Sequence, residues 1–108
     1  MIAVVQGDVW EAHISLKGVD EDALLGITLS CERLSFEIEA EHDEIEGYYF
    51  RIPGEITRTF KVGLHPYQIT LSLIDGEVFT IRPKDFLEVL RKPEVTNAGA
   101  KTRSRYKT

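Results

Sequence analysis

Residues 67–81 read YQITLSLIDGEVFTI, and this stretch decides the fold class of the chain. Apolar and polar side chains alternate from Tyr67 to Leu73, a period that is typical of a strand with one buried face. The pair Asp75-Gly76 follows and favours a tight hairpin turn, because both residue types tolerate positive φ angles. A second β-rich run, Val78 to Ile81, carries the chain back. The stretch therefore predicts an antiparallel β-hairpin.

Other parts of the chain have the same two-residue period. The runs with clear alternation are Val9–Lys17, Ile27–Cys31, Leu34–Ile38 and Gly47–Ile52. The phase of the alternation changes at Glu32-Arg33, so we expect a bulge or a tight turn there. Pro53-Gly54 suits a type II turn. Several short strands at this spacing predict an all-β fold, an antiparallel immunoglobulin-like β-sandwich of roughly seven strands.

The segments between these runs have weaker patterns. We expect an acidic loop at residues 39–46, a short strand or crossing connection at 55–60, and a loop at 62–66. Residues 84–91 fit a short helix or a strand, and their position after a hairpin favours the strand. Most of the aromatic bulk of the core is expected from Trp10, Phe36, Tyr48, Phe50, Tyr67 and Phe79.

The length and composition indicate a single globular domain. A chain of 108 residues has room for one modest core, and its hydrophobic content of 43% is ordinary for such a domain. We find no secretory signal and no apolar run near the roughly 20 residues of a membrane helix. Cys31 is in phase with Ile27 and Leu29, which predicts a buried thiol rather than a nucleophile. A reducing compartment is the default for such a chain.

Charge is distributed unevenly along the chain. Residues 91–108 hold six basic side chains and one acidic side chain, a net charge of +5, whereas residues 1–90 hold seven basic and seventeen acidic ones, a net charge of −10. We therefore expect a β-sandwich domain at 1–92 and an extended basic C-terminal arm at 93–108. The arm either folds over its own body or reaches another subunit. Nucleic acid is the least favoured partner, because the acidic body opposes phosphates.

No motif in the chain predicts catalysis or a cofactor. Neither His13 nor His65 has metal ligands at a suitable spacing, so we expect no zinc site. The acidic run at 39–46 lacks the spacing of a calcium loop, although its oxygens could still bind a calcium ion. Mutual repulsion is expected to raise the pKa values of its carboxylates. No serine lies in a nucleophile elbow, and the glycines do not form a phosphate loop. We therefore expect no catalytic residues, no metal and no cofactor.

The order of five short motifs carries a resemblance. They are Gly7-Asp8, LLGITL at 24–29, LHPYQITL at 64–71, DGEVFTI at 75–81 and FLEV at 86–89. Together these resemble the small immunoglobulin-like β-sandwich of bacteriophage virion proteins, including the N-terminal domain of baseplate upper proteins. The resemblance implies a structural role in a tail, baseplate, neck or capsid surface. It implies a location in the virion after assembly in the host cytoplasm, and it transfers no catalytic residue.

The leading hypothesis is a non-catalytic virion structural protein that forms a homo- or hetero-oligomer with other virion proteins and contacts no membrane. Its expected partner-binding residues are in the basic arm: Lys101, Arg103, Arg105, Tyr106 and Lys107. The alternative is a carbohydrate- or host-surface-binding β-sandwich module. That module would use Tyr49 and the acidic loop, with or without calcium.

Overall fold

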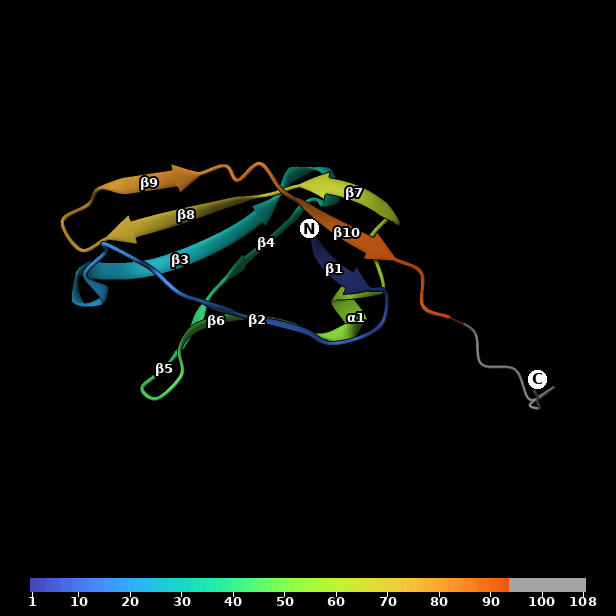
Figure 1. Ribbon diagram of the computed structural model, residues 1–108, viewed down its shortest axis with the longest axis horizontal. Coiled ribbons are helices and arrows are strands. Elements are labelled where there is room, and N and C mark those ends of the chain that lie inside the picture. The colour runs from blue at the N-terminus through green and yellow to red at the C-terminus, as the bar shows by residue number, and fades with distance from the viewer. Residues whose placement is uncertain (94–108) are drawn as a thin grey trace.

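The computed structural model describes residues 1–93, and these form an all-β fold (Figure 1). The strands are β1 (Ile2–Val5), β2 (Trp10–Ile14), β3 (Leu24–Cys31), β4 (Phe36–Glu39), β5 (Glu41–Asp43), β6 (Gly47–Ile52), β7 (Gly63–Pro66), β8 (Gln68–Leu73), β9 (Val78–Ile81) and β10 (Phe86–Leu90). One short helix, α1 (Gly54–Thr57), and two 3₁₀ turns, η1 (Glu21–Ala23) and η2 (Glu32–Leu34), complete the described elements. Of the arm expected at 93–108, only Pro93 is among the described residues.

The strands form three small sheets. The orders are β4-β3-β8-β9, β2-β6-β5 and β1-β10-β7. All paired strands are antiparallel except β1 and β10, which run parallel. In Figure 1, β9, β8 and β3 lie above β6 and β2, while β1, β10 and β7 lie at the opposite end of the molecule from the β8–β9 turn. The all-β class predicted from sequence is confirmed, but the strands outnumber the predicted seven.

The hairpin predicted at 67–81 is present as β8 and β9. Ser72 lies opposite Val78, and the Leu73 amide donates to the Glu77 carbonyl at 2.9 Å, so the connecting loop consists of residues 74–76. Gly76 has a φ of 95° and its amide donates to the Leu73 carbonyl. This is a three-residue loop with a bulge at glycine, one residue longer than the tightest hairpin.

The other clear strands are also confirmed. β2 and β6 lie within the predicted runs, whereas β3 begins three residues before its run and β4 ends one residue after its run. The phase change at Glu32-Arg33 is the turn η2, where Ser35 adopts a left-handed conformation with a φ of 50°. β10 is a strand and not a helix, with Leu87 and Val89 buried and Phe86 and Leu90 exposed.

Of the two alternatives at 55–60, the structure has the crossing connection, which includes α1 and links β6 of one sheet to β7 of another. Three other predictions between these strands are wrong. Pro53 precedes the helix α1 instead of entering a type II turn. Residues 63–66 form the strand β7 instead of a loop. Part of the acidic run forms β5, which pairs with β6. β1 has no counterpart among the predicted strands, because IAVV has no polar residue that could show an alternation.

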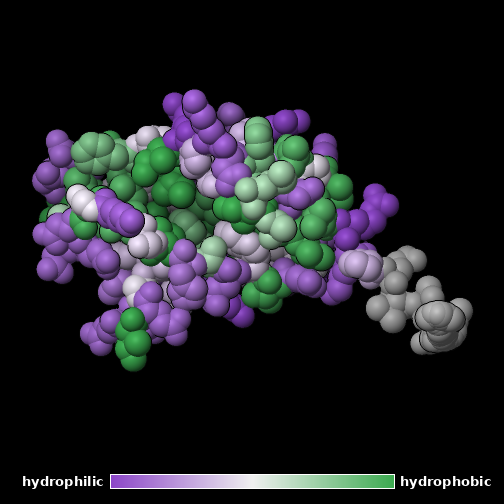
Figure 2. Space-filling view, in the orientation of Figure 1, coloured by the Kyte–Doolittle hydropathy of each residue, from purple (hydrophilic) through white to green (hydrophobic). Residues whose placement is uncertain are grey.

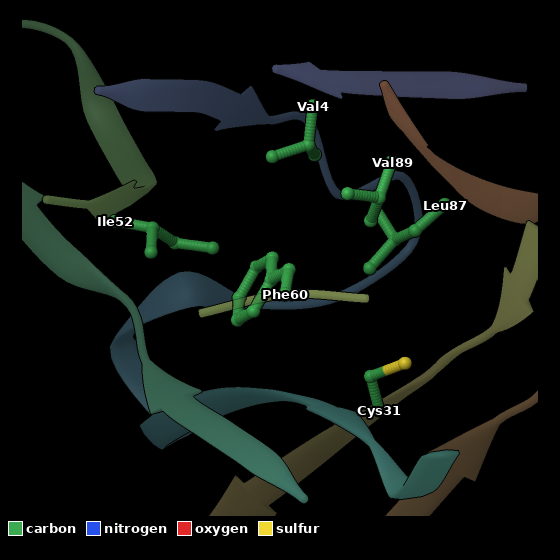
Figure 3. Close-up of a cluster of buried hydrophobic side chains, with 6 residues drawn as sticks. All are labelled: Val4, Cys31, Ile52, Phe60, Leu87 and Val89. Carbon is green, nitrogen blue, oxygen red and sulfur yellow. The ribbon is translucent and has the colours of Figure 1, made fainter. Parts of the chain in front are cut away.

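The interior consists of two adjoining clusters of buried side chains. The first contains Val4, Cys31, Ile52, Phe60, Leu87 and Val89, which converge around Phe60 (Figure 3). The second contains Leu24, Ile27, Leu29, Phe50 and Leu71. Trp10, Ile38 and Tyr67 are partly buried and pack against both clusters, so they join the two halves of the core. Phe79 is not a core residue as predicted, because 51% of it is exposed.

Helix α1 is tied to the turn between β1 and β2 through Thr57. The Thr57 side chain is fully buried, its hydroxyl donates to the Asp8 carbonyl at 2.7 Å, and its oxygen accepts from the Gly7 amide at 3.0 Å. A Cβ on Gly54 would clash with the Gly7 carbonyl oxygen, so glycine is required for this close approach. The turn also needs Gly7, whose φ is 85°.

Replacing Thr57 with valine is expected to lower the free energy of unfolding by about 1–3 kcal/mol, because the Gly7 amide and the Asp8 carbonyl lose their partner. Thr59→Val is the matched control, since the exposed Thr59 hydroxyl bonds only the Ile56 carbonyl. Urea unfolding of both variants measures the difference. Equal stability of Thr57→Val and Thr59→Val would contradict this role.

Candidate functional site

The outer face of the sheet β1-β10-β7 is largely apolar. Leu87 and Val89 of β10 point into the core, so Phe86, Glu88 and Leu90 point outward. Register places Pro66 opposite Phe86, Leu64 and Ala3 opposite Glu88, and Val5 opposite Leu90. We call these outward residues the apolar face: Ala3, Val5, Leu64, Pro66, Phe86, Glu88 and Leu90.

The apolar face is open to solvent. Leu64 is 47% exposed, Phe86 43% and Leu90 38%. Figure 2 shows hydrophobic side chains over the part of the surface formed by β10 and β7. Glu88 is the one charged residue of the apolar face, whereas the outward face of a sheet normally carries mostly polar residues. Contiguous apolar surface of this kind is typical of a protein–protein contact.

The basic stretch 91–108, which includes the expected arm at 93–108, begins next to this face. β10 ends at Leu90, and Arg91 and Lys92 follow directly. Lys92 pairs with Asp8, with Nζ 2.8 Å from Oδ1. The predicted partner-binding residues Lys101, Arg103, Arg105, Tyr106 and Lys107 lie outside the described residues, so their role stays a prediction.

A cleft of about 750 Å³ lies where the turn η2 meets the ends of β7 and β9. Arg33, Arg82, Glu32 and Glu37 line it, so its charge is mixed. Cys31 also borders the cleft but is fully buried, and its thiol donates to the Pro66 carbonyl at 3.3 Å. Burial raises the pKa of the Cys31 thiol. The buried thiol predicted from sequence is confirmed, and its environment disfavours the reactive thiolate.

The acidic run is organised as the β5–β6 hairpin. Asp43 accepts hydrogen bonds from the amides of Ile45 and Glu46 at 2.8 and 3.0 Å, and these bonds lower the pKa of its carboxyl. The prediction that mutual repulsion raises the pKa is therefore wrong for Asp43. Within residues 1–93, no three His, Cys, Asp or Glu side chains are grouped to hold a metal ion.

Tyr49, the candidate sugar-stacking residue, lies on this hairpin. Its hydroxyl donates to Glu41 at 3.3 Å, and its ring lies 5.6 Å from the His13 ring. A second cleft of about 520 Å³ adjoins the hairpin and is lined by His13, His42, Glu21, Glu44 and Glu46 among others. Ile45 lies in the turn at the tip of this hairpin and is 95% exposed.

His65 differs from its predicted loop position. It lies on β7 and is only 4% exposed. Its Nε2 is 2.6 Å from the Lys61 carbonyl oxygen, while its Nδ1 has no hydrogen-bond partner among the described residues. The sequence carried no signal for this burial, because GLHP shows no alternation and ends in proline.

Sequence reasoning also missed the apolar face, although the signal is visible. β1 reads IAVV and β10 reads FLEVL, so both faces of each strand are apolar. Such near-continuous apolar runs are typical of parallel strands that are covered on both faces.

Comparison with known proteins gives no relative: no family profile, curated protein or solved structure matches the chain. Within residues 1–93, no helix has the length and apolar character needed to cross a membrane.

Asp85, directly before β10, gives a pH test of the local structure. The terminal ammonium of Met1 lies 2.8 Å from Asp85 Oδ1, and this contact, with the Phe86 amide, lowers the pKa of the carboxyl. The folded-state pKa is below the unfolded value of about 3.9, so the stabilisation is present above that pH and lost as the pH falls through the folded pKa.

We therefore expect Asp85→Asn to be less stable than the parent chain at pH 7, and the difference to disappear in acid below the folded pKa. Urea unfolding midpoints at a series of pH values measure this difference. A constant difference across the series would show that the Asp85 charge does not stabilise the fold.

Proposed function

We propose that this chain is a non-catalytic structural subunit of a bacteriophage particle, in which it binds neighbouring subunits through the apolar face and the basic segment 93–108. The partner surface that fits has an apolar patch bordered by carboxylates. The apolar face carries the proposal, and the motif resemblance supplies the phage setting.

The sequence of β1 and β10 supports a covered outer face. A strand that meets water on one side normally alternates apolar and polar residues. Here Val4, Leu87 and Val89 fill the core, while Phe86 and Leu90 remain apolar on the other side. Removing such side chains from water is favourable at about 25 cal/mol per Å² of apolar area, so a neighbouring subunit gains affinity by covering them.

Charge supports the same contact and suggests its partner. The segment after β10 is basic, and it starts at the edge of the apolar face. Opposite charge on a partner would speed the encounter and fix the orientation, while the apolar contact supplies most of the affinity. The partner is thus a subunit with carboxylates around an apolar patch.

The immunoglobulin-like assignment belongs to this proposal as well. The layered arrangement of β9, β8 and β3 over β6 and β2 supports a sandwich, as does the shared interior of the second core cluster. The parallel pairing of β1 with β10 and the third sheet are additions to a simple two-sheet plan. We propose that this added sheet is the docking element of the subunit.

Removing residues 93–108 is expected to leave the body folded but to prevent incorporation into particles, because the basic contact is lost. Particles purified from cells that make the truncated chain are analysed by immunoblot. Phe86→Glu is expected to have the same effect through the apolar face. Ile45→Glu is the matched control, since it places the same charge on another exposed apolar position and should incorporate normally.

Circular dichroism of each purified variant separates a failure to fold from a failure to bind. Normal incorporation of the truncated chain would remove the basic segment from the proposal. Normal incorporation of Phe86→Glu would remove the apolar face, and with it the proposed function.

A second candidate is the carbohydrate- or host-surface-binding module. The second cleft favours it, because imidazole and carboxylate groups suited to sugar hydroxyls line it near Tyr49. A glycan array and melting curves with and without calcium test this candidate. If the chain is a structural subunit, we expect no glycan binding and no change of melting temperature with calcium. The Asp43 carboxylate already accepts hydrogen bonds within the turn. Glycan binding that Tyr49→Ala abolishes would favour the second candidate.

A further inference from the structure

The strand β9 is an outer strand with an open edge. It lies at the end of the order β4-β3-β8-β9, and all four of its residues are exposed. Val78 is 60% exposed, Phe79 51% and Ile81 45%. Exposed apolar edges attract other strands, and proteins usually protect them with charge, proline or cover.

The other outer strands of the three described sheets carry polar residues or are partly buried. β4 carries Glu37 and Glu39, β5 consists of Glu41, His42 and Asp43, and β2 carries Glu11 and His13. β1 and β7 are partly buried. Among the outer strands of residues 1–93, only β9 has residues that are all exposed and uncharged.

The register of the hairpin determines which backbone groups of β9 are free. The Leu73 amide bonds the Glu77 carbonyl, and hydrogen-bonded and non-bonded pairs alternate along an antiparallel ladder. The backbone groups of Phe79 and Ile81 therefore point toward β8. Those of Val78 and Thr80 point away from the sheet, toward the open edge.

The side chains of β9 continue the apolar inner face of the sheet. Phe79 lies opposite Leu71, and Ile81 lies opposite Ile69. Leu71 is buried at 4% exposure, so Phe79 and Ile81 lie on the core side but beyond the part of the core that is covered. A further strand beside β9 would extend this apolar strip and shield both side chains.

We propose that this further strand is β9 of a second copy of the chain, paired antiparallel about a two-fold axis at Thr80. Thr80 then lies opposite Thr80, and the free amides and carbonyls of the two copies bond each other. Phe79 lies opposite Ile81 of the second copy, an aromatic and β-branched pair of the kind that stabilises sheets. Two four-stranded sheets become one continuous sheet.

Symmetry and charge favour a second copy as the occupant. A two-fold antiparallel contact must pair residues on the same face, and a register about Thr80 does so for both faces of β9. The register about Thr80 pairs Phe79 with Ile81 and Val78 with Arg82, and it leaves Gly76, whose φ is 95°, outside the ladder. Val78–Ile81 has no charged residue, so two copies meet there without repulsion between side chains of the strand itself.

This contact uses a different surface from the apolar face. It goes beyond the proposed function, and either of the two proposals can fail while the other stands. Sedimentation velocity of the purified full chain tests it without any particle. The full chain is expected to sediment as a dimer at high concentration. Thr80→Pro removes an amide that points outward, which an edge strand tolerates, and is expected to weaken the dimer at least about tenfold.

A second variant keeps the test decisive if proline unfolds the hairpin. Phe79→Lys places a charge opposite Ile81 of the second copy and is expected to weaken the dimer to a similar degree. Ile45→Lys is the matched control, since it adds the same charge at the exposed tip of the β5–β6 hairpin and should leave the dimer intact. Circular dichroism confirms that each variant is folded.

A nitroxide label on Thr80→Cys reports the register, because the two-fold axis brings the labels of the two copies together. Electron paramagnetic resonance is expected to give one short distance between these labels, and a longer one for labels on Ile45→Cys. A monomeric full chain at every concentration would overturn the proposal, and so would a dimer that Phe79→Lys leaves unchanged.

Discussion

The inward row of side chains on β3 is the constraint on which the other elements depend. Cys31 belongs to the first core cluster, while Leu24, Ile27 and Leu29 belong to the second. β3 also has a hydrogen-bonded neighbour on each side, β4 and β8, so its register fixes theirs. A slip of one residue would turn the whole row toward solvent and open both clusters.

A fold built from three small sheets leaves part of its apolar surface uncovered. The shared interior covers one face of each sheet, but β1 and β10 have apolar residues on both faces. β9 extends past the part of the core that the opposite layer covers. The proposed contacts with other subunits follow from this imbalance: one would cover the apolar face, and the other would complete the open edge beside β9.

The sequence predicted the elements whose alternation runs for at least four residues with a clear polar face. That rule covers β2, β3, β6 and the β8–β9 hairpin, and the phase change at Glu32-Arg33 correctly located η2. It failed for β1, which has no polar residue, for β7, which shows no alternation, and for α1. The α1 segment is fixed by the contacts of Thr57 with a distant turn, which no local pattern reveals. The apolar runs of β1 and β10 are visible in the sequence, but only the register of three separated strands shows that they form one face.

Photo-crosslinking within assembled particles tests the central claim most directly, namely that a neighbouring subunit covers the apolar face. A photoreactive amino acid replaces Phe86 in one chain and Ile45 in another, and mass spectrometry identifies the crosslinked products. Position 86 is predicted to crosslink to a neighbouring subunit in high yield, and position 45 is not. Crosslinks from position 45 alone, or none from position 86 in intact particles that contain the chain, would contradict the claim.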